Sequence, residues 1–257
     1  AFVPRDTTVL MERRGDVWDP WPQPFPVFPN APGESTDFAG LDDHTRAVLR
    51  WLWAALRRRT HAGAPPPEVF DAASQIGGVL GKVADLLSPV TDHVEANALK
   101  PSLRAAATLL RTLRTSMALV FRRYLNDPER RRDYVTADFL LANLIGMMQD
   151  DLLLAPDGTW ASFPQWLDNL QAIEHLDYRA WLGQHGCRSE TLRSTIIRGL
   201  GDAVFNTGYD GAAGTALNGL IRLNLTVRGS VFWEMSAGMG ETVFTPMYEI
   251  LKKRKVD

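Results

Sequence analysis

The chain has 257 residues, of which 45% are hydrophobic and 23% are charged, and its formal net charge at pH 7 is -2. This composition predicts a soluble globular protein and excludes a largely disordered chain. Because 28 basic residues are balanced by 30 acidic ones, no overall field favours binding to nucleic acid. No apolar run in the sequence reaches the roughly 18 residues that a membrane-spanning helix needs.

Cysteine and histidine usage argues against a metal site. The single cysteine, Cys187, excludes a disulfide within the chain and a zinc site built on several cysteines. None of the five histidines lies three or four residues from another histidine or from the cysteine. We therefore expect no bound metal ion, and the cysteine count favours a reducing, cytoplasmic location.

A β-hairpin is predicted near the N-terminus. Residues 7–12 are compatible with a strand, Gly15 and Asp16 supply a turn, and residues 17–18 begin the return strand. Six prolines interleaved with aromatic residues follow at 20–32. We expect this stretch to run extended without a regular hydrogen-bonded ladder, because proline has no backbone N–H.

Apolar residues at spacings of three and four predict amphipathic helices through most of the remaining chain. These helices are expected at residues 42–60, 69–87, 103–125, 136–154, 190–206 and 214–226, and again after residue 240. Pro101 fits a first helical turn, where its missing N–H is harmless. The sequence thus predicts a mainly α fold with an extended segment near 227–235. Three parts are expected: a hairpin and Pro-rich connector (1–40), a helical domain (41–226) and a return segment (227–257).

Two adjacent acids, Asp150 and Asp151, follow Gln149 at the end of a predicted apolar helix. Paired acids of this kind can hold magnesium beside a prenyl diphosphate, but that chemistry needs a second acid cluster on a facing helix. The sequence offers no such cluster in a comparable context. We interpret these acids as part of a solvated helix face.

An apolar cluster lies next to a glycine turn near the C-terminus. Phe232, Trp233, Met235 and Met239 could line a flat ligand or an apolar substrate, or could pack in an ordinary core. Glu234 lies among them, and it is either partly desolvated and able to exchange a proton or directed into solvent. The residues leave both pairs of alternatives open.

The turn itself contains Gly238, Met239 and Gly240. It lacks the third glycine of a dinucleotide-binding fingerprint and does not follow a convincing βαβ strand. Small residues before a helix allow a ligand to approach the backbone closely, although an ordinary tight turn has the same composition.

The stretch FWEMSAGMGETVF at 232–244, with PMYEIL at 246–251, resembles a segment of bacterial FAD-dependent oxidoreductases of the amine oxidase and phytoene desaturase superfamily. Supporting similarities are AFVP at 1–4, PWP at 20–22 and YRAWLGQHG at 178–186. In the proteins it resembles, a Gly-rich nucleotide-binding unit precedes this region, and a strand that completes the FAD site follows it. The residues that carry the resemblance lie between positions 1 and 251 and so span most of the chain.

The resemblance implies that the chain is the substrate-side helical region of a longer product, which binds FAD together with other chains or segments. It implies hydride transfer from a small-molecule substrate to FAD. It implies a substrate pocket lined by Phe232, Trp233 and Met235, and a flavin-adjacent turn of Gly238, Met239 and Gly240. No catalytic residue is assigned.

Two other functions fit the same residues. A non-catalytic helical subunit would bind another chain and would expose a large apolar face. A free-standing small-molecule binder would instead have a closed pocket and a well-covered surface. The FAD-dependent oxidoreductase remains the first expectation, with a helical interaction subunit as its alternative.

Overall fold

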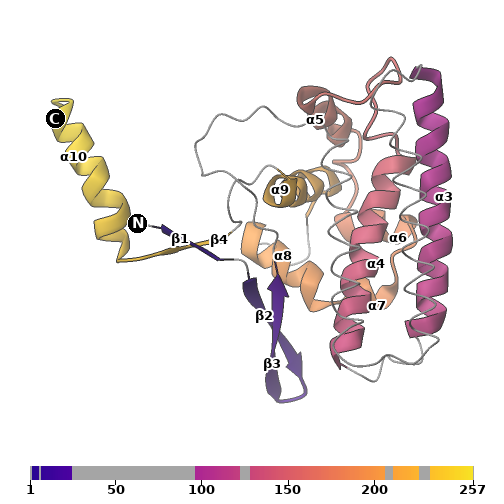
Figure 1. The fold of residues 1–257 in the computed structure, drawn as a ribbon, viewed down its shortest axis with the longest axis horizontal. Coiled ribbons are helices and arrows are strands. Elements are labelled where there is room, and N and C mark those ends of the chain that lie inside the picture. The colour runs from indigo at the N-terminus through magenta and orange to yellow at the C-terminus, as the bar shows by residue number, and fades with distance from the viewer. Residues whose placement is uncertain are drawn as a thin grey trace. The chain divides into compact units, whose positions relative to one another are not determined.

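The computed structural model describes residues 2–5, 7–24, 96–121, 128–205, 211–225 and 232–256 (Figure 1). Of these residues 64% are helical, which confirms the mainly α class. The helices expected at 42–60 and 69–87, and the Pro-rich connector beyond Pro24, lie outside the described residues. The chain divides into two units, one of residues 1–36 and 221–257 and the other of residues 37–220.

Segments from the two ends of the chain pair with each other in the first unit. Strand β1 (Phe2–Arg5) runs antiparallel to β4 (Phe232–Met235). Phe2 lies opposite Met235, and Arg5 lies opposite Phe232. The extended segment expected near 227–235 is thus confirmed at its described residues. The residues between these strands, which include a hairpin at 7–24 as well as the helical residues, are thus an insertion between two neighbouring strands.

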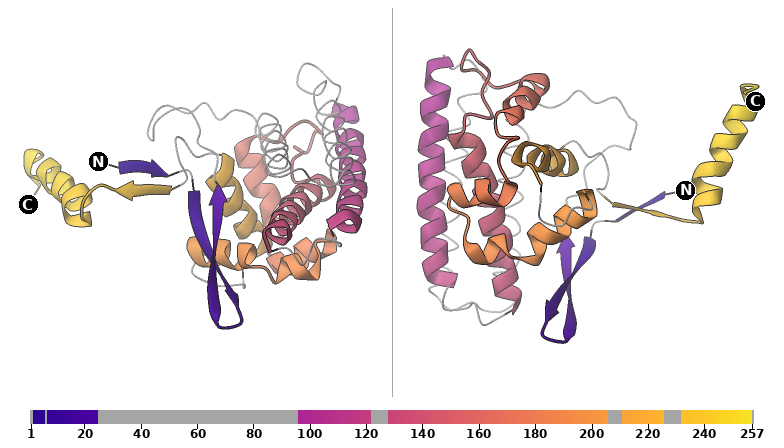
Figure 2. Two further views of the ribbon diagram at one scale, coloured as in Figure 1. Left: turned by 60° about the horizontal axis from the view of Figure 1, so that its bottom comes forward. Right: turned by 180° about the vertical axis from the view of Figure 1, so that it is seen from behind.

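The predicted hairpin is confirmed as β2 (Thr7–Arg14) and β3 (Val17–Pro24), drawn in indigo in Figures 1 and 2. Gly15 has a φ of 60°, which a type II′ turn requires at its first central residue. Glycine adopts this conformation without the steric cost that a Cβ atom brings. The turn composition therefore sets the hairpin register.

The expectation of a segment without a ladder from Pro20 onward is wrong for its first residues. Strand β3 extends to Pro24, and Pro20 and Pro22 lie opposite Met11 and Val9. Every second residue of an antiparallel strand directs its backbone N–H away from the partner strand. Prolines at alternate positions can all occupy these outward sites, so no bond to β2 is lost.

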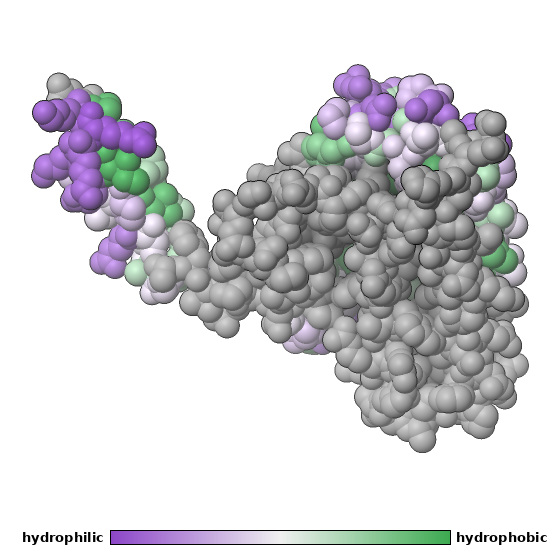
Figure 3. Space-filling model, turned by 45° about the horizontal axis from the view of Figure 1, so that its top comes forward, coloured by the Kyte–Doolittle hydropathy of each residue, from purple (hydrophilic) through white to green (hydrophobic). Residues whose placement is uncertain are grey.

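The C-terminal part of the first unit is helical, as expected after residue 240. A π-helical turn, η2 (Gly240–Phe244), leads directly into α10 (Thr245–Lys253). A green apolar stripe runs along this helix beside purple charged residues in Figure 3. The large exposed apolar side chains of α10 are Met247, Tyr248, Ile250 and Leu251, and Phe244 at the end of η2 is also exposed.

The second unit is built around two long helices, α3 (Ala96–Phe121) and α4 (Pro128–Gln149). The other described helices are α5 (Phe163–Gln171), α6 (Tyr178–Gln184), α7 (Ser189–Leu192), α8 (Thr195–Phe205) and α9 (Ala213–Leu225). The helices expected at 190–206 and 214–226 are confirmed as α8 and α9, with α7 as a separate turn before α8. Helices α5 and α6 were not predicted.

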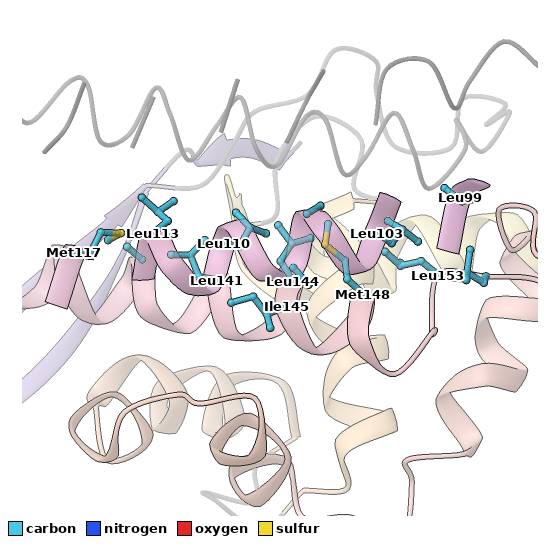
Figure 4. Packing of buried hydrophobic residues seen from close by; sticks show 14 residues of the cluster. Leu99, Leu103, Leu110, Leu113, Met117, Leu141, Leu144, Ile145, Met148 and Leu153 are labelled. Atoms are coloured by element: carbon cyan, nitrogen blue, oxygen red, sulfur yellow. The ribbon is translucent and has the colours of Figure 1, made fainter. Parts of the chain in front are cut away.

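The core lies where α3 packs against α4, as Figure 4 shows. Most of its members lie on the facing sides of the two helices, among them Leu103, Leu110, Met117, Leu141, Ile145 and Met148, and Leu153 and Leu154 join it from the residues after α4. Removing a buried Leu or Met side chain from such a core costs about 2–5 kcal/mol. This packing fixes the positions from which α4 presents its polar residues.

The boundaries of these two helices differ from expectation. Helix α3 begins at Ala96, so Pro101 lies inside it and not in its first turn. The additional turn buries Leu99, which offsets part of the cost of an internal proline. Helix α4 ends at Gln149 and not at Leu154, because Asp151 adopts a left-handed conformation with a φ of 57°. The N–H of Leu152 then bonds to the carbonyl of Met147 and closes the helix.

Candidate functional site

The residues predicted to form the pocket and the turn lie on β4 and on the turn that follows it. Phe232 and Trp233 lie on β4 opposite Arg5 and Pro4. Met235 ends the strand with 37% of its surface exposed, and its Sδ accepts a 3.3 Å hydrogen bond from Thr242 Oγ1. The end of the strand is thereby tied to the first turn of the following helix.

The turn after β4 is closed by hydrogen bonds to one carbonyl. The backbone N–H groups of Glu241 and Thr242 both donate to the Gly238 oxygen at 3.0 Å, and so does the Thr242 hydroxyl. Met239 is 53% exposed and Glu234 is exposed, so the outward alternative holds for Glu234. Neither side chain belongs to a core within the described residues.

Gly238 and Gly240 are not required by the described structure. Neither has a positive φ, and a Cβ atom added to either would meet no described atom within 4 Å. Gly186 differs, because its φ is 79° and an added Cβ would lie 2.6 Å from a nitrogen of Arg114. Glycine at Gly238 and Gly240 would be needed only if a group outside the described residues came close to the backbone there.

A second constellation, which the sequence did not reveal, lies inside the helical unit. The Nε of Arg114 on α3 is 3.0 Å from Oδ1 of Asp138 on α4, and Asp138 is fully buried. The other carboxylate oxygen accepts a 3.1 Å bond from the backbone N–H of Arg188 and lies 3.5 Å from the Cys187 sulfur. A guanidinium nitrogen of Arg114 also donates to the His185 carbonyl at 2.8 Å. The ion pair thus joins two long helices to the loop after α6.

His185 extends this network. Its Nδ1 is 3.1 Å from Oε1 of Gln149, and its Nε2 is 3.0 Å from Oδ2 of Asp150. The indole N–H of Trp181 donates to the same Asp150 oxygen at 2.7 Å. Because each ring nitrogen already faces an oxygen, the imidazole has no nitrogen left for a substrate proton. The arrangement therefore positions α6 against α4 and is not an acid–base site.

The electrostatics agree with a structural role. Burial raises the pKa of Asp150, but hydrogen bonds from His185 and Trp181 and the charge of His185 outweigh it, so this pKa lies below its ordinary value. Burial raises the pKa of the Cys187 thiol, and the Asp138 carboxylate raises it further. Burial and Asp138 also raise the pKa of Tyr134 to about 12. A protonated, buried thiol is a poor nucleophile.

The two adjacent acids do not form a metal site. Asp150 binds His185 and Trp181, whereas Asp151 lies 2.6 Å from the Lys100 amine and 3.5 Å from an Arg104 nitrogen. Their carboxylates therefore point to different partners. Within the described ranges no three His, Cys, Asp or Glu side chains converge to hold a metal ion. The expectation of a merely solvated acidic face is thus incomplete, since both acids are paired.

Sequence spacing could not reveal this network, because Arg114 and His185 are 71 positions apart. Two signals were present. Asp138 and Asn143 occupy buried positions of α4, although a polar residue there must find a partner. Gly146 lies inside the same helix, where an added Cβ would overlap the Trp181 ring. Both features indicate close contact with another element.

Comparison of the chain with protein-family models, with curated proteins and with solved structures finds no match. No helix among the described residues has the length and apolar character needed to cross a membrane.

Proposed function

We propose that the chain is the substrate-side part of a flavin-dependent oxidoreductase, and that other chains or segments supply the FAD-binding domain. The observation that carries this proposal is the antiparallel pairing of β1 with β4. Because β1 and β4 are neighbours, everything between them, the β2–β3 hairpin and the helices, is an insertion between two paired strands. A substrate domain inserted into a cofactor-binding domain needs this topology.

The glycine turn supports the same proposal. Gly238 and Gly240 follow β4 directly and have open space where a side chain would lie. In the proposed enzyme this space receives the flavin, while Phe232, Trp233 and Met235 contribute to an apolar substrate pocket. FAD, when bound, supplies the acceptor for a hydride from the substrate. The residues of this chain bind and orient the substrate and exclude water from it.

In the proposed enzyme, the polar network within the helical unit stabilises the fold of the substrate-side helices. It fixes α6 and α4 relative to each other through buried, paired groups, and no catalytic residue is assigned to it. We place the complete protein in the cytoplasm, with a small-molecule substrate and no nucleic-acid partner.

The test is an absorption spectrum of the chain purified in its natural assembly, with mass spectrometry of the polypeptides that accompany it. The proposal expects the visible bands of an oxidised flavin and polypeptide segments beyond residues 1–257. A colourless assembly would exclude it.

A matched pair of variants locates the flavin. Gly238→Ala in the complete protein should lower its flavin content, because the new methyl group occupies the space proposed for the ring. Gly211→Ala is the control, because an added Cβ at Gly211 also meets nothing within 4 Å. Equal flavin contents in both variants would show that the turn does not belong to the cofactor site.

A non-catalytic interaction subunit is the second candidate. The exposed apolar stripe of α10 favours it, since side chains such as Met247 and Ile250 are 53% and 51% exposed. This candidate expects a stable complex with another protein and no flavin in that complex.

A further inference from the structure

The ring of His185 bridges the ends of two helices. His185 is the C-cap of α6, and its side chain is 8% exposed. Its Nδ1 is 3.1 Å from Oε1 of Gln149, the last residue of α4, and its Nε2 is 3.0 Å from Oδ2 of Asp150, the next residue. Both ring nitrogens are thus within hydrogen-bond distance of an oxygen.

The neighbouring donors show that both of these oxygens are acceptors. A nitrogen of Arg111 donates to the same Gln149 oxygen at 2.7 Å, and a guanidinium can only donate. The Gln149 amide therefore presents its oxygen, not its NH2 group, to the imidazole as well. On the other side, the indole N–H of Trp181 donates to Asp150 Oδ2. Burial raises the pKa of Asp150, but hydrogen bonds from His185 and Trp181 bring it below its ordinary value, so this carboxyl is ionised at neutral pH and has no proton to donate.

A ring with one proton cannot satisfy both contacts. A neutral imidazole has one N–H and one lone pair, so either tautomer turns a lone pair toward an acceptor oxygen. An imidazolium donates at both nitrogens. Its charge also lies beside the Asp150 carboxylate and the C-terminal end of α4, where the helix dipole is negative. The contacts therefore fit a ring that holds two protons.

We propose that His185 is a proton-controlled latch between α6 and the end of α4. With two protons, the ring holds both Gln149 and Asp150. When the ring loses one proton, the remaining N–H stays with Asp150, because a hydrogen bond to a carboxylate is stronger than one to an amide. The lone pair of Nδ1 then faces the Gln149 oxygen, and this contact opens.

Among the described residues, the other charged groups around the latch are paired or screened. Arg114 of α3 donates to the His185 carbonyl, but its charge is balanced by Asp138 of α4. Arg111 of α3 is exposed to water, which screens its charge. The remaining charged groups near the latch form ion pairs of their own, Asp151 with Lys100 and Glu190 of α7 with Arg131. The carboxylate in contact with the ring is therefore the main charge acting on its second proton.

Nitrogen-15 NMR of the intact wild-type chain, labelled at histidine, tests the latch directly. His185 is assigned through its contact with the Trp181 ring, whose centroid is 4.8 Å from that of the imidazole. We expect two ring N–H signals from His185 at about pH 5, and the Nε2–H signal alone once the ring has lost a proton at higher pH. A single N–H in acid, or a neutral ring that keeps its proton on Nδ1, would overturn the proposal.

Urea unfolding at several pH values measures what the latch contributes. The folded chain provides acceptors for both N–H groups, so the second proton stabilises it, and this contribution is complete in acid and is lost as the pH rises. Histidine changes its charge between about pH 5 and 8, where Asp150 stays ionised. The ratio of the folding equilibrium constants of the wild type and His185→Gln should therefore be at least about tenfold larger at pH 5 than at pH 8. A ratio that is independent of pH, or that grows as the pH rises, would contradict the latch.

Two arginine variants of α3 test whether Gln149 is the contact that opens. In Arg111→Met the Gln149 amide can turn and donate its NH2 group to the deprotonated ring, so the effect of pH on stability should shrink to about threefold or less. Loss of the Arg111 charge alone would act in the opposite direction, because a nearby cation disfavours an imidazolium. Arg104→Met removes another exposed arginine from the same helix and should keep the pH dependence of the wild type. Equal pH dependence in the two variants would exclude an opening at Gln149.

Discussion

Arg114 and Asp138 form an ion pair in the interior of the helical unit, with 3.0 Å between Nε and Oδ1 and side chains that are 10% and 0% exposed. The pair joins α3 to α4, and its carboxylate also holds the backbone at Arg188. Burial without a partner would be very costly for either charge, so the two residues depend on each other.

Asp138→Ala should therefore destabilise the chain by about 3–5 kcal/mol, because it leaves the Arg114 guanidinium buried without its anion. Arg131→Ala is the control, since Arg131 pairs with Glu190 at 2.7 Å but is 44% exposed. That substitution should cost at most about 1 kcal/mol. Urea unfolding followed by circular dichroism measures both. Similar losses in the two variants would mean that the buried pair contributes no more than a surface pair.

Gly146→Ala should also destabilise the chain, by about 1–3 kcal/mol, because the added methyl group overlaps the rings of Trp181 and His185. Gly183→Ala is the matched change in a neighbouring helix, where the new Cβ would lie 3.6 Å from Leu192 in ordinary contact. It should be neutral or should stabilise by up to about 1 kcal/mol. Thermal unfolding of the two variants distinguishes them. Stabilisation by both would contradict the close contact between α4 and α6.

The stability of the chain should depend on the ionisation of Asp150 in acid. Its pKa is lower in the folded chain than in the unfolded chain. The ionised carboxylate therefore contributes stability above the unfolded pKa of about 3.9, and this contribution is lost as the pH falls through the folded value. Asp150→Asn should be less stable than the wild type at neutral pH, and the difference should shrink in acid below about pH 4. A difference that is constant from pH 7 to pH 3 would show that the carboxylate charge has no part in the network.

The Cys187 thiol should not react with a thiol-specific reagent while the chain is folded. It is buried, and burial together with Asp138 keeps it protonated. Ellman's reagent should detect one thiol per chain in denaturant and almost none in native buffer. Rapid reaction of the native chain would contradict the buried position of Cys187 beside Asp138.

Local sequence features correctly predicted those elements whose signals are local. Gly15 in a two-residue turn set the hairpin, leucines at helical spacing placed α3, and an amphipathic pattern placed the C-terminal helix. The errors occurred where packing outweighs propensity. Burial of Leu99 extends α3 to residues before Pro101, and Asp151 ends α4 in a left-handed conformation, which aspartate adopts in a minority of cases.

The prolines of β3 show the same limit of prediction from local sequence. Proline composition argued against a ladder, but whether a missing N–H matters depends on which side of the strand it faces. Only the pairing with β2 shows that Pro20, Pro22 and Pro24 all lie in outward positions. A list of residues cannot give that orientation, since a shift of one residue in register reverses it.

The sequence by itself determined the helical class, the hairpin and the absence of a multi-cysteine site. Hydrophobic periodicity and turn residues act between residues that are close in the sequence, and a cysteine count does not depend on the fold. The tertiary structure alone decided which polar residues meet. Arg114, Asp138 and His185 come from separate elements, and what joins them is the requirement that a buried charge find a partner when the helices pack.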